Sequence, residues 1–160
     1  MLSVSEDKRR RFEEGWLETL FRSYPSQSVS SMLLERDPFR NPVGYRFREG
    51  VRVLTGELLG AMDARRIASA LENIVQIRAV QDFSPAEALG FVFASKKISR
   101  EILCDSTEDL RELDDRIDRL ILAAFDLYVR CREKIHEVQL NETRRKVGLL
   151  EKLYSQVEGG

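Results

Sequence analysis

The sequence predicts an all-α protein, a bundle of about five helices that ends in a long C-terminal helix. Apolar residues recur at steps of three and four along each long segment, whereas no segment has the alternating period or the β-branched richness of a strand. The 160 residues are 42% hydrophobic and 33% charged, which is typical of one compact core. We expect residues 1–142 to form a single helical domain and residues 143–160 to form a C-terminal helical extension or tail.

The first predicted helix covers residues 5–24. Pro25 ends it, and a long connection follows whose short apolar run, Met32 to Leu34, indicates about two turns of helix. The first helix carries one apolar stripe at helical spacing, made of Phe12, Trp16, Leu17, Leu20, Phe21 and Tyr24.

A second long helix is expected from Pro42 to Met62. Asn41 has the chemistry of an N-cap, and proline is favoured at the first helical position. Three glycines interrupt the apolar face of this helix and indicate close contacts with neighbouring helices; they are Gly44, Gly50 and Gly56.

Asp63 is expected to cap a third long helix that ends near Asp82. The string SPAE at residues 84–87 predicts the start of the next helix, because it has the pattern of a capping box with a proline in the first turn. Arg78 lies four residues before Asp82 on the preceding helix, so the two are expected to form an ion pair.

The last helix is expected to start in the string STEDL, with Ser106 or Thr107 as its N-cap. It carries an unbroken apolar seam that suits core packing or a helix partner, made of Leu110, Leu113, Ile117, Leu120, Ala124, Leu127 and Cys131. The pattern lapses near residue 140, and a second apolar set follows in a shifted register: Val147, Leu150, Tyr154 and Val157. A straight helix over residues 107–157 would be about 75 Å long, against roughly 40 Å for a globule of this size. Its end must therefore project, bend back or pair with another chain.

Charge and composition exclude several classes of partner. The chain has 26 basic and 27 acidic residues, and acidic residues follow the basic string KRRR at once, so we expect no nucleic-acid binding. No apolar run reaches the length of a membrane span and the first residues lack a secretory signal, so we expect no direct membrane insertion and a cytoplasmic location. Cys104 and Cys131 are expected to be reduced thiols packed as small hydrophobic residues.

The sequence carries no catalytic or cofactor signature. The standard hydrolase, P-loop, dinucleotide and zinc-protease motifs do not occur in it. His136, the only histidine, would have to bind a metal with Cys131 and distant carboxylates, which is too sparse for a zinc or di-iron site. We therefore expect no enzyme, no metal and no cofactor. Catalysis stays open only through an acid pair, such as Asp82 and Glu87, that folding brings together.

Aromatic residues leave a ligand-binding alternative open. Core packing is the favoured interpretation, but the same residues, with Arg78, would line an internal pocket for a small molecule or, less favoured, for haem. They are Phe12, Trp16, Phe21, Phe47, Phe91, Phe93, Phe125 and Tyr128.

Three strings carry a resemblance to a known family: NPVGYRFREGV, IVQIRAVQDFSPAEALGFVFASKK and RIDRLILAAFDLYVRCREKIHEVQLNE. They lie within about residues 12–142, and the sequence resembles the N-terminal domain family of RsbRD, a co-antagonist of the RsbT kinase in the bacterial general stress response. The resemblance implies an all-helical sensor domain, which in larger relatives precedes a STAS output domain. It also makes a globin-like, haem-free bundle plausible, although a simpler antiparallel bundle stays open.

The resemblance extends to individual positions, namely Asn41, Pro42, Tyr45, Arg78, Gln81, Asp82 and Ser84. Helix capping accounts for Asn41 and Ser84. Ligand or partner contacts are therefore expected at Tyr45, Arg78, Gln81 and Asp82. Only residues 143–160 follow the matched strings, so we expect a stand-alone regulator to which the kinase-antagonist activity does not carry over.

The function expected from the sequence is that of a non-enzymatic cytoplasmic sensor or regulatory domain of bacterial stress or redox signalling. We expect it to act by protein–protein contact, with a protein partner or as a homodimer. The contact helix is expected to present Val147, Leu150, Tyr154 and Val157. The alternative is a small-ligand receptor, and a small-molecule signal is compatible with either function.

Overall fold

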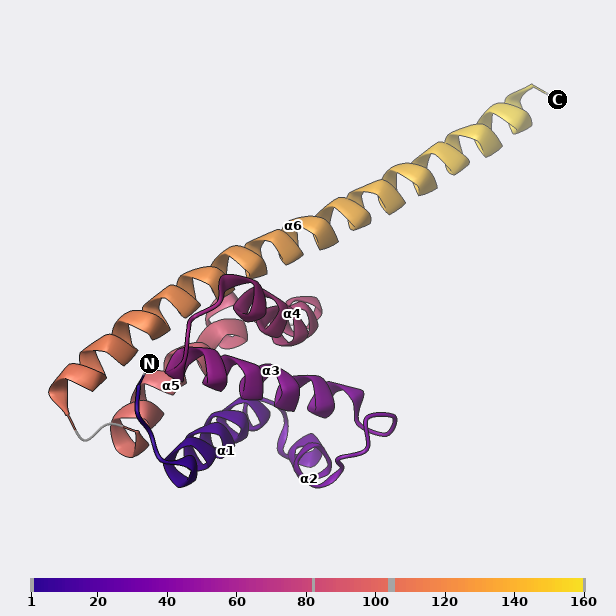
Figure 1. The fold of residues 1–160 in the computed structure, drawn as a ribbon. Coiled ribbons are helices and arrows are strands. Elements are labelled where there is room, and N and C mark those ends of the chain that lie inside the picture. The colour runs from indigo at the N-terminus through magenta and orange to yellow at the C-terminus, as the bar shows by residue number, and fades with distance from the viewer. Residues whose placement is uncertain (1, 82, 104–105, 160) are drawn as a thin grey trace.

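Six helices and no strand make up the described residues, which confirms the predicted all-α class (Figure 1). The computed structural model describes residues 2–81, 83–103 and 106–159. The helices are α1 (Glu6–Arg22), α2 (Ser26–Leu34), α3 (Pro42–Leu59), α4 (Ala64–Val80), α5 (Pro85–Ile102) and α6 (Thr107–Glu158). None of these helices is long and apolar enough to cross a membrane.

The predicted N-caps of four helices are confirmed. Asn41, Asp63, Ser84 and Ser106 each accept a hydrogen bond from a backbone N–H of the following helical turn. The capping box is complete: Ser84 Oγ accepts from the Glu87 N–H at 3.2 Å, and the Glu87 carboxylate accepts from the Ser84 N–H at 2.8 Å. The corner between α4 and α5 is therefore fixed by local sequence.

Helix α3 ends at Leu59, three residues earlier than predicted. The chain turns sharply after it, and Met62 has a left-handed backbone with φ of 56°. The buried Glu57 carboxylate stabilises this turn, because it accepts the Asp63 N–H at 2.9 Å and pairs with Arg66 at 3.0 Å. Helical periodicity does not predict such contacts, because they cross a turn between two helices.

Helix α2 has nine residues, slightly more than the two turns predicted, and none of its residues is buried. Polar groups on or next to α3 hold it in place. Arg48 donates to the carbonyl oxygens of Met32 and Leu33 at 2.8 and 2.9 Å, and the Asn41 side chain donates to that of Met32 at 3.1 Å. The Arg48 guanidinium also lies 5.4 Å from the Phe21 ring centroid.

Gly50 lies in a close contact between α3 and α4. A Cβ atom there would lie 2.9 Å from the Ile74 side chain and 3.0 Å from the Ala70 carbonyl oxygen. Ile74 is fully buried and the carbonyl belongs to a helix backbone, so neither has room to move. The expectation of a close helix contact is confirmed at this glycine.

Replacing Gly50 by alanine is expected to lower the free energy of unfolding by about 1–3 kcal/mol, because overpacking outweighs the gain in helix propensity. Chemical denaturation followed by circular dichroism measures the change. Gly90 is the matched control: it lies inside α5, and a Cβ there would meet nothing within 4 Å. Gly90→Ala should therefore raise the free energy of unfolding by about 0.5–1 kcal/mol. Equal effects at both positions would contradict the close contact.

Helix α6 packs against α4 and α5 and then continues away from the body of the molecule (Figure 1). The predicted seam faces the core from Leu113 to Leu127, while Leu110 and Cys131 at its two ends are half-buried. Two ion pairs fix α6 against α5, Arg100 with Asp114 at 2.8 Å and Lys96 with Asp118 at 2.6 Å.

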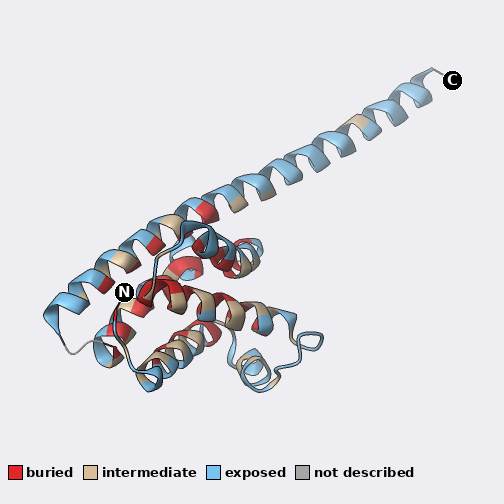
Figure 2. Cartoon of the chain, viewed as in Figure 1, coloured by how far each residue is buried: buried red, intermediate tan, exposed pale blue. Residues whose placement is uncertain are grey.

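The C-terminal part of α6 projects into solvent. We call residues 136–158 the α6 projection. All of them are exposed except the half-buried Gly148, and Figure 2 shows this part in pale blue with one tan residue. The helix has 52 residues, a length of about 78 Å, and passes residue 140 without a break. The end of α6 therefore projects and does not bend back, and pairing with another chain stays a prediction.

Candidate functional site

Arg78 is the most deeply buried of the three predicted contact residues that the structure describes. It lies on α4 and is 0% exposed. Its guanidinium donates from Nε to the Ala88 carbonyl oxygen at 2.8 Å, from Nη2 to that of Glu87 at 2.7 Å and from Nη1 to Ser23 Oγ at 2.9 Å. Arg78 thus ties the first turn of α5 and the end of α1 to α4.

Three aromatic rings enclose the Arg78 guanidinium. Its central carbon lies 4.5 Å from the Phe83 ring centroid, 5.4 Å from that of Tyr24 and 5.9 Å from that of Phe91. Burial lowers the pKa of Arg78 from its usual high value. We call Arg78 with these three rings the arginine cluster.

Gln81 belongs to the same neighbourhood, whereas Tyr45 does not. The Tyr24 hydroxyl donates to Gln81 Oε1 at 2.7 Å, and burial raises the pKa of Tyr24. Tyr45 is 45% exposed on α3, and within the described residues no hydrogen bond or ring contact joins it to the arginine cluster. Asp82, expected to pair with Arg78 and considered as an acid partner of Glu87, lies outside the described residues. Roles in binding for these four residues stay predictions.

Sequence reasoning missed Tyr24 and Phe83 as neighbours of Arg78. Tyr24 was assigned only to the apolar stripe of the first helix, and Phe83 lies in the predicted corner. Their positions immediately before Pro25 and Ser84, at the ends of two helices, were the available signal. Only the fold shows that the segment after α1 and the segment before α5 meet.

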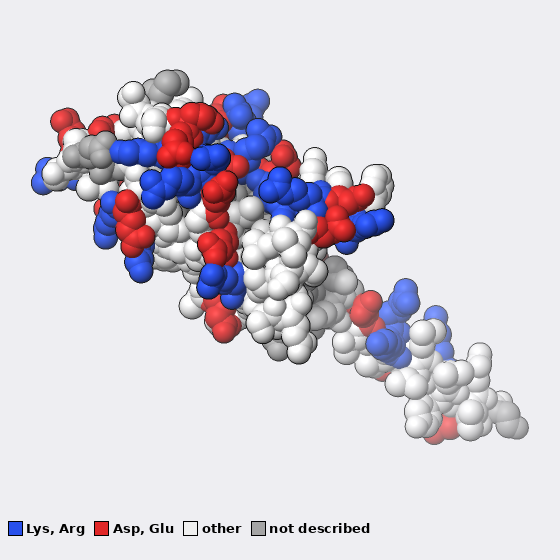
Figure 3. Space-filling view, turned by 90° about the horizontal axis from the view of Figure 1, so that it is seen from below, with Lys and Arg blue, Asp and Glu red and all other residues white. Residues whose placement is uncertain are grey.

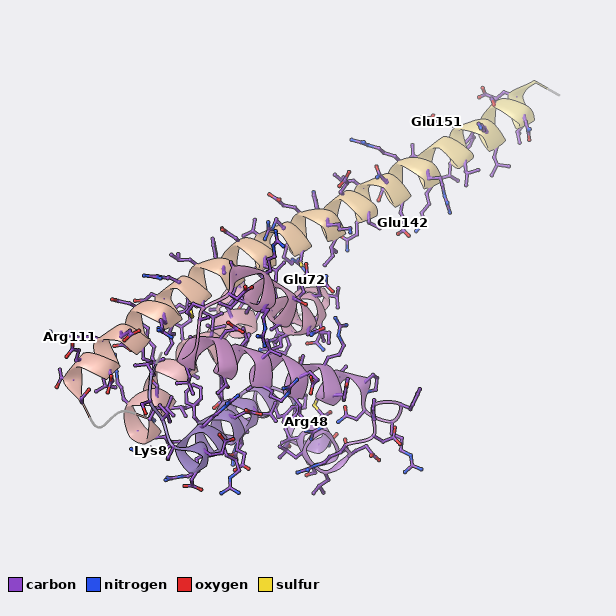
Figure 4. The ribbon with its side chains drawn as sticks, viewed as in Figure 1. Lys8, Arg48, Glu72, Arg111, Glu142 and Glu151 are labelled. Carbon is purple, nitrogen blue, oxygen red and sulfur yellow. The ribbon has the colours of Figure 1, made fainter. Side chains whose placement is uncertain are left out.

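A cavity of about 330 Å³ lies between α4 and α6. Apolar residues of both helices form its floor and charged residues surround it; Figure 4 labels one of these, Glu72 of α4, beside α6. It is lined by Met62, Ala64, Ile67, Ala68, Leu71, Glu72, Arg119, Leu120, Ala123, Asp126, Leu127 and Arg130. None of the aromatic residues that the sequence offered for a pocket lines it.

The residues considered for metal binding are not assembled in the described part of the chain, where no three histidine, cysteine or acidic side chains converge. His136 is exposed where the α6 projection begins. Cys131 is a free, half-buried thiol whose pKa is raised by burial, as expected for a cysteine packed as a hydrophobic residue. Cys104 lies outside the described residues.

The predicted contact residues at the C-terminal end lie on the α6 projection. Val147, Leu150, Tyr154 and Val157 are 48%, 55%, 70% and 78% exposed. On the face of the body in Figure 3, lysine and arginine alternate with aspartate and glutamate, so no single sign of charge dominates it. Exposed apolar side chains on an isolated helix make this part of α6 a candidate surface for contact with another molecule.

The fold and this surface define a class of protein: an all-α domain with a helix that projects from its core. Within that class, the chain belongs to the family of the RsbT co-antagonist protein rsbRD N-terminal domain, whose family model matches residues 11–143. Membership confirms the resemblance found in the sequence and indicates a regulatory domain of stress signalling, in a family of sensor domains that is not a known enzyme family. The match ends inside the α6 projection, before Val147.

A second comparison gives a relative of similar extent. An uncharacterised protein of Archaeoglobus fulgidus is 21% identical over 148 residues, which cover 91% of this chain and 91% of the relative. No solved structure matches the chain.

Proposed function

We propose that this chain is a non-enzymatic, cytoplasmic regulatory domain of stress or redox signalling that acts by protein–protein contact through the α6 projection. Family membership supports the regulatory role. The free thiol of Cys131 fits a reducing compartment. The exposed apolar residues of the α6 projection carry the proposal that this helix is the contact surface.

The construction of α6 supports a signalling role for that contact. Its first half packs its buried face on α4 and α5, and its second half presents the contact residues. Both halves belong to one uninterrupted helix, which transmits displacement as a rigid element. A partner bound at the α6 projection is therefore coupled to the packing of the body. The partner is another protein or a second copy of the chain, and we take the homodimer as the case to test first.

Leu150→Asp combined with Tyr154→Asp is expected to weaken self-association of the full chain. Two apolar contacts are lost from each copy and charge is introduced, so the dissociation constant should rise by at least about 100-fold. Light scattering across a concentration series measures the mass, and circular dichroism checks that helicity is retained.

The matched control carries the same charge on another face of the same turn. Ser155 and Gln156 are exposed beside Tyr154. Ser155→Asp with Gln156→Asp should leave the dissociation constant within about threefold of the wild-type value. Equal masses for the wild-type chain and the Leu150/Tyr154 variant would contradict self-association through the α6 projection.

The α4–α6 cavity favours a second candidate function, reception of a small apolar molecule. Its volume of about 330 Å³ is at the lower end for ligand sites, and its apolar floor with a charged rim suits an amphipathic ligand. A wild-type chain that is monomeric at every concentration, with a small molecule co-purifying, would favour this function over the first.

A further inference from the structure

An apolar stripe runs along α6 on a face separate from the one that packs on the core. In the α6 projection its residues alternate steps of three and four, as in a coiled coil: Leu140, Thr143, Val147, Leu150, Tyr154 and Val157. In heptad terms, Leu140, Val147 and Tyr154 occupy position a, and the other three occupy position d. All six are exposed in this chain.

On the body only position d of this register carries apolar residues, because Glu133, Asp126 and Arg119 occupy position a. Steps of seven back from Leu150 through Thr143 and His136 reach Val129 and Leu122, and both are exposed at 36% and 66%. Phe125, 50% exposed, lies between them. The core-facing seam of the same segment, from Leu113 to Leu127, lies on another side of the helix. The apolar pattern at both positions a and d is therefore confined to residues 140–157 of the α6 projection.

Charges beside the stripe distinguish between a parallel and an antiparallel partner. In a parallel pair, position g of one helix faces position e of its partner five residues later. Lys146 at g would then face Glu151 at e, and within the described residues neither forms an ion pair in its own chain. Arg132 at g would face Glu137 at e in the same way, although one of its N–H groups already donates to the Ala79 carbonyl oxygen at 2.9 Å.

In an antiparallel pair, position e of one helix faces position e of its partner. The e positions of the α6 projection are Glu137, Arg144, Glu151 and Glu158. Every antiparallel alignment that pairs three or more of them brings two glutamates together, which is unfavourable. Valine at position a with leucine at position d, as at Val147 and Leu150, is also typical of parallel two-stranded coils.

From the stripe and these charges we infer that the occupant of this face is a second copy of the chain, packed parallel and in register along the α6 projection as a two-stranded coiled coil. This inference rests on the proposed function, and it adds the identity, the direction and the register of the partner. Both bodies then lie at the same end of the dimer, side by side, and the two C-termini lie together at the other end.

Disulfide trapping tests the register directly. In the full chain with Cys104→Ser and Cys131→Ser, single cysteines are introduced as Leu140→Cys, Leu150→Cys or Lys152→Cys. Helix axes roughly 8–10 Å apart, with Cα atoms roughly 2.3 Å from each axis, leave at least about 3–5 Å between equivalent a or d positions. This separation permits a disulfide, whereas Lys152 at position f lies on the outer face.

Mild oxidation with glutathione, followed by non-reducing electrophoresis, is expected to crosslink Leu140→Cys and Leu150→Cys at least about tenfold faster than Lys152→Cys. A mixture of the Leu140→Cys and Val157→Cys chains provides the test for the opposite direction. In a parallel dimer these two positions are about 26 Å apart and give no mixed crosslink, whereas an antiparallel coil centred between them aligns them.

The outcomes separate this inference from the proposed function. Fast self-crosslinking at both Leu140→Cys and Leu150→Cys supports the parallel coil. A dimer in light scattering that crosslinks only in the mixed sample, or no faster than Lys152→Cys, overturns the parallel register and leaves contact through the α6 projection intact. A monomer at all concentrations without crosslinks overturns both the register and the homodimer.

Discussion

Arg78→Ala is expected to lower the free energy of unfolding by about 3 kcal/mol or more. The substitution removes hydrogen bonds to Ser23, Glu87 and Ala88 and leaves a space among three aromatic rings. These contacts join α1, α4 and α5, so one side chain stabilises three helices together. Denaturation followed by circular dichroism measures the loss.

Two further variants separate shape from charge at this position. Arg78→Lys keeps the positive charge but not the planar fork that reaches three acceptors, so it should recover less than half of the loss. Arg10→Ala is the control for a surface arginine: its pair with Asp7 at 2.7 Å is exposed on both sides, and the change should stay within about 0.5 kcal/mol. A loss at Arg78 as small as that at Arg10 would contradict a structural role for the arginine cluster.

Trp16→Ala is expected to have a comparable or larger effect, about 3–5 kcal/mol. Trp16 is 0% exposed, and its ring centroid lies 5.5 Å from that of Phe12 and 6.5 Å from that of Phe91. Its indole N–H donates to the Phe91 carbonyl oxygen at 2.8 Å, which joins α1 to α5. Small domains are stable by only about 5–15 kcal/mol, so this variant approaches the limit of folding.

Trp16→Phe tests the hydrogen bond separately from the volume. It keeps an aromatic ring and loses the N–H donor, so the expected loss is about 1–2 kcal/mol. The chain has one tryptophan, and both variants must therefore be followed by circular dichroism instead of fluorescence. Equal losses for the alanine and phenylalanine variants would show that the hydrogen bond, and not the packing, carries the effect.

Local signals in the sequence predicted the five long helices and their starts correctly, but not the start of α2. Asn41, Asp63 and Ser84 cap helices because their side chains reach a backbone N–H only a few residues away. The seam from Leu113 to Leu127 faces the core because the helical period puts those residues on one side. Such features depend on neighbours in the chain and need no knowledge of the fold.

Features that depend on distant residues were not predictable in the same way. The end of α3 at Leu59 is stabilised by the buried Glu57 through Asp63 and Arg66, and helical periodicity does not encode that contact. The position of α2 depends on Arg48 reaching carbonyl oxygens more than a dozen residues away. The globin-like arrangement of the bundle stays a prediction.

By itself the sequence determined the helical class, the helix caps, the two apolar sets of the last helix and the family. Each of these depends on the types of residues that lie close together in the sequence. Only the tertiary structure decided that Arg78 is enclosed by Tyr24, Phe83 and Phe91, and that the second apolar set remains in solvent. Burial depends on which residues are neighbours in space. The apolar residues from Leu113 to Leu127 pack into the core, whereas those from Val147 to Val157, at the same spacing, are exposed to solvent. The end of α6 extends beyond the body that its first half covers, and its apolar residues are therefore available to a partner.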